Sequence, residues 1–191
     1  MSSYLLTAPA VEPVSLLEAK AFLRVEHDDD DDIITALVAA ARNHVEAQTR
    51  RALITQTWRL VRDAWPGDGR LKVAPAPLRD IAAARVFDAD GFAHAIDTQA
   101  FTIDMSDTSP VIGFAPWSLA GPGRMVAGIE IDVEVGYGDA PADVPEPLRQ
   151  AVRLLIAHWY ENRGLAAIGT SVALLPGTVA ALLAHFRVLS L

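Results

Sequence analysis

The amino-terminal part of the chain has hydrophobic residues at helical spacing. Ser15-Leu-Leu-Glu18 matches a capping box, in which the Ser hydroxyl accepts a first-turn N–H and the Glu reaches back to the cap. This motif predicts a short helix that ends near Val25. A second helix is predicted from residue 33 to about residue 52, because apolar residues recur there every three or four positions. They are Ile33, Ile34, Leu37, Val38, Ala41 and Val45.

Between residues 54 and 138 the pattern becomes typical of β-strands. Residues 129–135 alternate strictly between apolar and acidic side chains, which predicts a half-buried strand in an antiparallel sheet. Residues 55–62 are rich in β-formers and predict another strand. Asp88-Ala-Asp-Gly91 is a favoured hairpin turn between two further strand-like segments. Shorter strands are expected at 70–73, 101–104 and 111–114.

Helical spacing returns after three prolines at positions 141, 145 and 147. Residues 148–159 carry a wide apolar stripe, and residues 179–186 predict a last short helix. Neither helical end could bury its stripe alone, so the two ends should pack together.

The predicted fold class is therefore α+β, with a four-helix core and an inserted antiparallel β-module. The expected divisions are an extended amino-terminal arm (1–13), the helical core (14–53 and 139–187), the β-module (54–138) and a carboxy-terminal tail (188–191).

Composition narrows the classes of function. The 191 residues include no cysteine, which excludes a disulfide framework and a zinc–thiolate site. The net charge of −8 argues against wrapping nucleic acid, because phosphate neutralisation needs clustered Lys and Arg. No basic secretory n-region precedes Pro9 and Pro13. Residues 164–186 are uncharged and long enough to span a membrane, but Pro176-Gly177 interrupts them, so no membrane segment is expected.

Two acidic motifs offer alternatives between metal binding and local structure. The five consecutive aspartates 28–32, called here the acidic run, suit a divalent cation or a helix amino terminus. We favour the helix terminus, because consecutive helical residues point in different directions and make a poor cage. Asp88-Ala-Asp-Gly91 opens like a calcium loop, but the third ligand and the closing Glu are missing, so the turn is favoured.

No catalytic constellation is evident. His158 with nearby Glu161 could act as an acid–base group, but it has neither a nucleophile nor a metal beside it. Phosphate-binding loops and the G-x-S-x-G elbow are absent from the sequence. We therefore predict no catalytic residues, no bound metal and no cofactor.

Several residues are candidates for a protein interface. Trp65 and Trp117 lie beside prolines in loops, where they could anchor a partner or pack locally. The uncharged loop after residue 164 is also a candidate, because loops are normally polar and contiguous apolar surface marks partner sites. Its candidates, with those of the tail, are Leu165, Ile168, Val172, Leu174, Leu175, Arg187, Val188, Leu189 and Leu191.

The order and spacing of four segments resemble a known family. They are residues 12–26 with the acidic run, residues 33–58, residues 135–152, and residues 158–163 followed by 175–183. Together they resemble the head–tail connector (adaptor) proteins of tailed phages, in the subgroup with a β-domain inserted between two helical pairs. Gene transfer agents, which are phage-like particles, use similar parts.

The resemblance implies a structural role without catalytic residues. Such subunits form a ring of about twelve copies below the portal protein, extend the DNA channel and dock the next stopper or tail component. Double-stranded DNA would pass without specific binding, and the particle neck would assemble in the bacterial cytoplasm. The alternatives are a small metal-dependent hydrolase using His158 and Glu161, and a non-viral adaptor that holds a peptide with Trp65 and Trp117.

Overall fold

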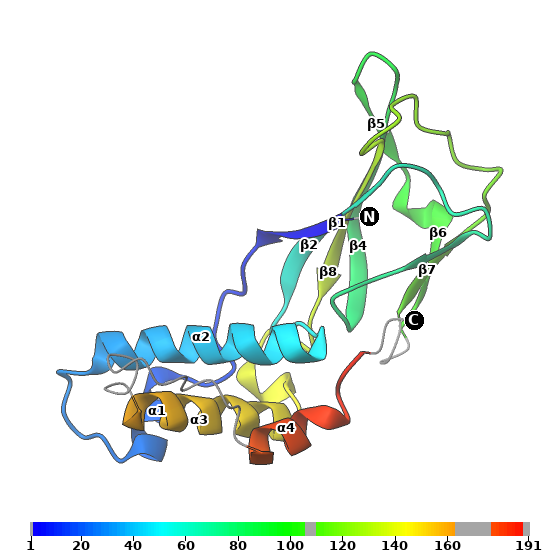
Figure 1. The fold of residues 1–191 in the computed structure, drawn as a ribbon. Helices are drawn as coiled ribbons and strands as arrows, with labels where there is room; N and C mark the ends of the chain where they lie inside the picture. Colours follow the sequence, from blue (N-terminus) through cyan, green and yellow to red (C-terminus); the bar gives the residue numbers. More distant parts are fainter. Residues whose placement is uncertain (1, 106–109, 163–176, 189–191) are drawn as a thin grey trace. The chain divides into compact units, whose positions relative to one another are not determined.

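The computed structural model describes residues 2–105, 110–162 and 177–188, and the chain divides into two compact units (Figure 1). The β unit comprises Met1–Ala10 and Thr55–Gly136, and the helical unit comprises Val11–Ile54 and Tyr137–Leu191. The four α-helices and two antiparallel sheets of the described residues confirm the predicted α+β class. Both units draw on segments that are far apart in the sequence.

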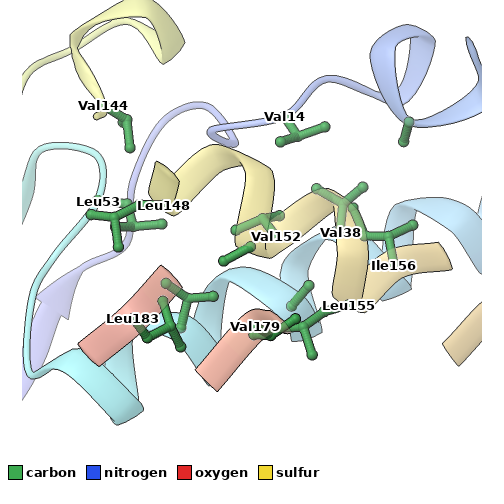
Figure 2. Close-up of a cluster of buried hydrophobic side chains, with 14 of the residues drawn as sticks. Val14, Val38, Leu53, Val144, Leu148, Val152, Leu155, Ile156, Val179 and Leu183 are labelled. Carbon is green, nitrogen blue, oxygen red and sulfur yellow. The ribbon is translucent and has the colours of Figure 1, made fainter. Parts of the chain in front are cut away.

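The helical unit contains α1 (Leu16–Leu23), α2 (Asp31–Thr49), α3 (Glu146–Glu161) and α4 (Gly177–Ala184), with a short 3-10 helix, η2 (Pro141–Asp143), before α3. Helices α2 and α3 pack side by side, and α1 and α4 each contact both of them. Figure 2 shows the buried apolar cluster at their centre. Its members come from both ends of the chain, as the sequence predicted, and include Val14, Val38, Leu53, Leu148, Val152, Leu155, Val179 and Leu183.

The start of α1 confirms half of the capping-box prediction. Ser15 Oγ accepts the Glu18 N–H at 3.2 Å, as a helix cap should. The Glu18 carboxylate, however, pairs with Arg149 and Arg153 of α3, with Nη2–Oε1 distances of 2.8 and 2.9 Å. Two guanidinium groups are stronger partners for a carboxylate than one backbone N–H. Glu18 therefore joins two helices instead of closing its own cap.

The β unit holds two sheets. A five-stranded antiparallel sheet has the order β1 (Ser2–Thr7), β2 (Gln56–Arg62), β8 (Ile129–Val135), β4 (Leu78–Phe87) and β5 (Ala93–Ile96). A three-stranded sheet has the order β3 (Arg70–Lys72), β7 (Val111–Phe114) and β6 (Phe101–Asp104), and a short 3-10 helix, η1 (Thr98–Ala100), precedes β6. Residues 2–7, which lie in the segment expected to be an extended arm, form the edge strand β1 and pair with β2.

Strand β8 confirms the alternation read from the sequence. Its four apolar residues, Ile129, Ile131, Val133 and Val135, are fully buried. On the opposite face, Asp132 pairs with Arg59 Nε at 2.6 Å and with Arg85 Nη2 at 2.7 Å. Glu130 lies 3.1 Å from both of these arginines. Two of the three acidic residues of β8 are therefore paired with arginines of the neighbouring strands β2 and β4.

The hairpin between β4 and β5 turns at the predicted residues. Asp88 Oδ1 accepts the N–H groups of Asp90 and Phe92 at 3.0 and 2.9 Å, and Asp88 Oδ2 lies 2.8 Å from His94 Nε2. Gly91 has a φ of +87°, which favours glycine. These contacts engage both carboxylate oxygens of Asp88 in stabilising the turn.

Candidate interaction surfaces

Trp65 packs within the β unit. Its indole Nε1 donates to the Ala120 carbonyl at 2.9 Å. Its ring lies 5.1 Å from the Phe114 ring and 6.1 Å from the Phe101 ring, measured between centroids. A half-buried tryptophan with a satisfied N–H is typical of local packing. The contacts of Trp65 therefore favour the packing alternative over the interface alternative.

Trp117 has the opposite character. It is 89% exposed in the loop of residues 115–128, and the same loop exposes Met125 (92%) and Val126 (72%). The sequence analysis singled out Trp117 but missed Met125 and Val126. The signal available was the low charge of this loop, in which Arg124 is the single charged residue. Exposed aromatic and Met side chains are enriched in protein interfaces.

The 115–128 loop is anchored against the β4–β5 hairpin. The Gly123 N–H donates to the Phe87 carbonyl at 2.8 Å, and the Arg124 guanidinium lies 4.7 Å from the centroid of the Phe87 ring. A Cβ at Gly123 would lie 2.3 Å from the Ala89 nitrogen, so only glycine fits this close approach. The exposed apolar side chains are therefore carried by a loop with a defined path.

The described part of the tail lies against the end of α2. The Phe186 carbonyl accepts from Arg51 Nε at 2.7 Å, and the Val188 N–H donates to the Thr49 carbonyl at 3.0 Å. The Arg187 side chain is exposed. Five predicted interface residues of the uncharged loop and two of the tail lie outside the described residues, namely Leu165, Ile168, Val172, Leu174, Leu175, Leu189 and Leu191.

The acidic run is used within the helical unit. Asp28 and Asp31 lie 2.6 and 2.7 Å from Lys20 Nζ, and Asp30 accepts a hydrogen bond from the Tyr160 hydroxyl. Hydrogen bonding to Lys20 lowers the pKa of Asp28, and hydrogen bonding to Asp28 and Asp31 raises the pKa of Lys20. Helix α2 begins at Asp31, so two acids lie in its first turn, as the dipole interpretation predicts.

Among the described residues, no three His, Cys, Asp or Glu side chains are arranged to hold a metal ion. His158 Nδ1 lies 3.4 Å from Asn162 Nδ2 in the last turn of α3, and Glu161 is exposed. Across the same described ranges, no helix is long and apolar enough to cross a membrane.

Two further apolar surfaces of the helical unit were not singled out by the sequence. A groove of about 500 Å³ lies between the start of α3 and α4. On α1, Leu17 is 79% exposed and Phe22 is 40% exposed. The groove is lined by Pro147, Thr178, Ala181, Leu182, His185 and Phe186.

The chain has relatives in both sequence and structure. The family model of phage gp6-like head-tail connector proteins matches residues 13–77, which hold α1, α2 and the first strands after them. No curated protein matches the chain.

Solved structures match over the whole chain. A chain from the "neck of empty GTA particle computed with C6 symmetry" is 25% identical, with a TM-score of 0.81. Chains from the "virion of native gene transfer agent (GTA) particle" and the "neck of native GTA particle computed with C12 symmetry" are 26% and 27% identical, with TM-scores of 0.82 and 0.73. Each match covers 100% of this chain and 97% of the other. The sequence match over residues 13–77 and the structural matches over the whole chain together support a head–tail connector similar to the phage gp6-like proteins and to neck chains of a gene transfer agent particle.

Proposed function

We propose that this connector assembles into a closed ring of about twelve copies below a portal protein, extends the DNA channel and docks the next stopper or tail component. The observation that carries this proposal is the match over the whole chain to chains from the neck of a gene transfer agent. One of those necks has C12 symmetry. The proposed role is structural and needs no catalytic residue, metal or cofactor, and the particle would assemble in the bacterial cytoplasm.

The charge of the chain supports passage of DNA without specific binding. At pH 7 the net charge is −8, and a ring of such subunits would repel the phosphate backbone. Proteins that hold DNA tightly do so by releasing phosphate counterions with Lys and Arg. Repulsion instead lets the duplex slide through the channel.

Electron microscopy of the connector mixed with its portal protein tests the ring proposal. We expect an added ring below the portal in negative-stain averages, with the rotational symmetry of the portal. The connector alone can remain a monomer, because a portal would supply the template for assembly. Portal particles that stay unchanged at every connector concentration would contradict the proposal.

We further propose that the tail contacts the portal. The first residue of the tail, Val188, donates its backbone N–H to the Thr49 carbonyl at the end of α2. We expect deletion of residues 189–191 to weaken portal binding in a pull-down or by interferometry, because the apolar residues Leu189 and Leu191 would be lost.

The matched control for this deletion is Gln48→Ala, which changes an exposed side chain at the end of α2 and leaves the apolar residues of the tail in place. Circular dichroism of both variants checks that the fold is retained, so that a change in binding reports on the contact with the portal. If the deleted variant binds the portal as tightly as the full chain, the tail is not the contact.

A further inference from the structure

The groove on the helical unit is lined almost entirely by apolar atoms, with Thr178 and His185 as the polar residues of its lining. Helix α4, which forms one wall, contains no charged residue, and Pro147 of α3 closes the other side. Leu182 and Phe186 are only half buried, although they are large apolar side chains. Contiguous apolar surface of this kind usually marks a binding site for a partner.

The outer face of α1 has matching properties. Leu17 and Ala21 lie four residues apart, so they share one face of the helix, and both are exposed. The two charged side chains of α1 already have partners within the same copy: Glu18 binds the arginines of α3 and Lys20 binds the acidic run. Covering the Leu17 face would therefore leave these ion pairs intact.

These two surfaces lie on opposite flanks of α3. Each helical residue turns the chain by about 100°, so Arg149 lies about 200° from Pro147, and Arg153 about 240° from it. Arg149 and Arg153 are the residues that bind α1, whereas Pro147 lines the groove beside α4. Two complementary surfaces on opposite sides of one unit allow each copy to bind the next head to tail. Such a series of contacts closes into a ring when the rotation between neighbouring copies divides a full turn evenly.

The two elements also match in length. Helices α1 and α4 each have eight residues, which corresponds to about 12 Å. The outer face of α1 can therefore lie along the whole of α4. A second copy is the favoured occupant, because an apolar helix face and an apolar groove occur on the same chain and no unpaired charge has to be buried with them.

We propose that neighbouring copies join head to tail by seating the Leu17–Ala21 face of α1 in the groove between α3 and α4 of the next copy. This inference rests on the proposed ring and names the surfaces that form it. Heterologous contacts of this type create oligomers in which every copy uses one α1 face and one groove.

Cysteine cross-linking tests the contact, and the absence of native cysteine makes the test clean. The variant carries both Leu17→Cys and Ala181→Cys, which replace exposed side chains. In the complex with the portal, mild oxidation or a short bis-maleimide reagent should convert this variant into a ladder of covalent oligomers on a denaturing gel. The two single variants mixed together should give dimers only, because each copy then carries one cysteine and can form one cross-link.

The matched control is Ala40→Cys with Ala181→Cys, in which the first cysteine lies at an exposed position of α2 and should give no ladder.

Leu17→Asp is expected to weaken assembly by about tenfold or more, because a charge would enter an apolar groove. Portal-bound rings without a ladder, or a ladder equally strong in the control, would overturn this contact and leave the ring proposal standing. Dimers from Leu17→Cys alone would show a symmetric contact instead. If no ring forms at all, both proposals fail.

Discussion

Replacing Asp132 with alanine is expected to destabilise the β unit by about 3 kcal/mol. The Asp132 side chain is only 9% exposed at the centre of the five-stranded sheet, between Arg59 of β2 and Arg85 of β4. Removal of the carboxylate would leave these two half-buried guanidinium groups with Glu130 as their shared ion-pair partner among the described residues. A half-buried charge that has lost its partner lowers the free energy of unfolding by more than the intact ion pair adds to it. Urea denaturation followed by circular dichroism measures the loss.

Glu134→Ala is the matched control for Asp132→Ala. Glu134 lies on the same face of the same strand, two residues away, and no ion pair within 4.0 Å involves it among the described residues. We expect a change within about 0.5 kcal/mol for this variant. Equal destabilisation by the two substitutions would mean that the arginines of β2 and β4 do not depend on Asp132.

The stabilisation from Asp132 should also depend on pH. Burial opposes ionisation, but hydrogen bonds and charge from Arg59 and Arg85 outweigh it and hold the pKa of Asp132 below its usual value. An Asp with a lowered folded-state pKa stabilises the protein fully above its unfolded value of about 3.9, and this contribution is lost as the pH falls through the folded value. The stability difference between the native chain and Asp132→Ala should therefore shrink below about pH 4.

The sequence predicted elements well where local pattern decides them. The apolar–acidic alternation of residues 129–135 predicted strand β8 and its buried face, and the spacing around Leu148 predicted α3. The partners of β8 could not be predicted, because Arg59 and Arg85 reach Asp132 only through the order β2-β8-β4, and this order depends on contacts between distant segments. The same holds for Glu18, whose partners lie more than 130 residues away in the sequence.

Edge strand β1 shows a different limit. Residues 2–7, Ser-Ser-Tyr-Leu-Leu-Thr, do not alternate, and every one of them is exposed. Their strand conformation comes from backbone pairing with β2, which leaves no trace in the spacing of apolar residues.

The two tryptophan candidates differ in their surroundings for a similar reason. Trp65 and Trp117 have the same Pro-flanked setting in the sequence, but only Trp65 has Phe101 and Phe114 beside it in the fold.

Replacing Leu148 with alanine is expected to destabilise the helical unit by about 3 kcal/mol, through lost burial and the cavity that remains. Leu148 is fully buried in the cluster that joins α3 to residues of the amino-terminal segment and of α4. Because the two ends of the chain share this one core, the loss should reach α1 and α2 as well. Hydrogen exchange measured by mass spectrometry should therefore become faster throughout residues 16–49, although Leu148 lies about a hundred residues further along the chain.

Leu17→Ala is the matched control, since it removes the same atoms from a side chain that is 79% exposed. Its effect on the free energy of unfolding should stay within about 0.5 kcal/mol. Faster exchange confined to α3 and α4 in Leu148→Ala would show that the two helical segments unfold separately. Faster exchange in all four helices would show that the two helical segments, which the β unit separates in the sequence, unfold as one cooperative unit. A subunit must unfold in this way if it is to hold α1 and the α3–α4 groove in a fixed relation for contact with its neighbours.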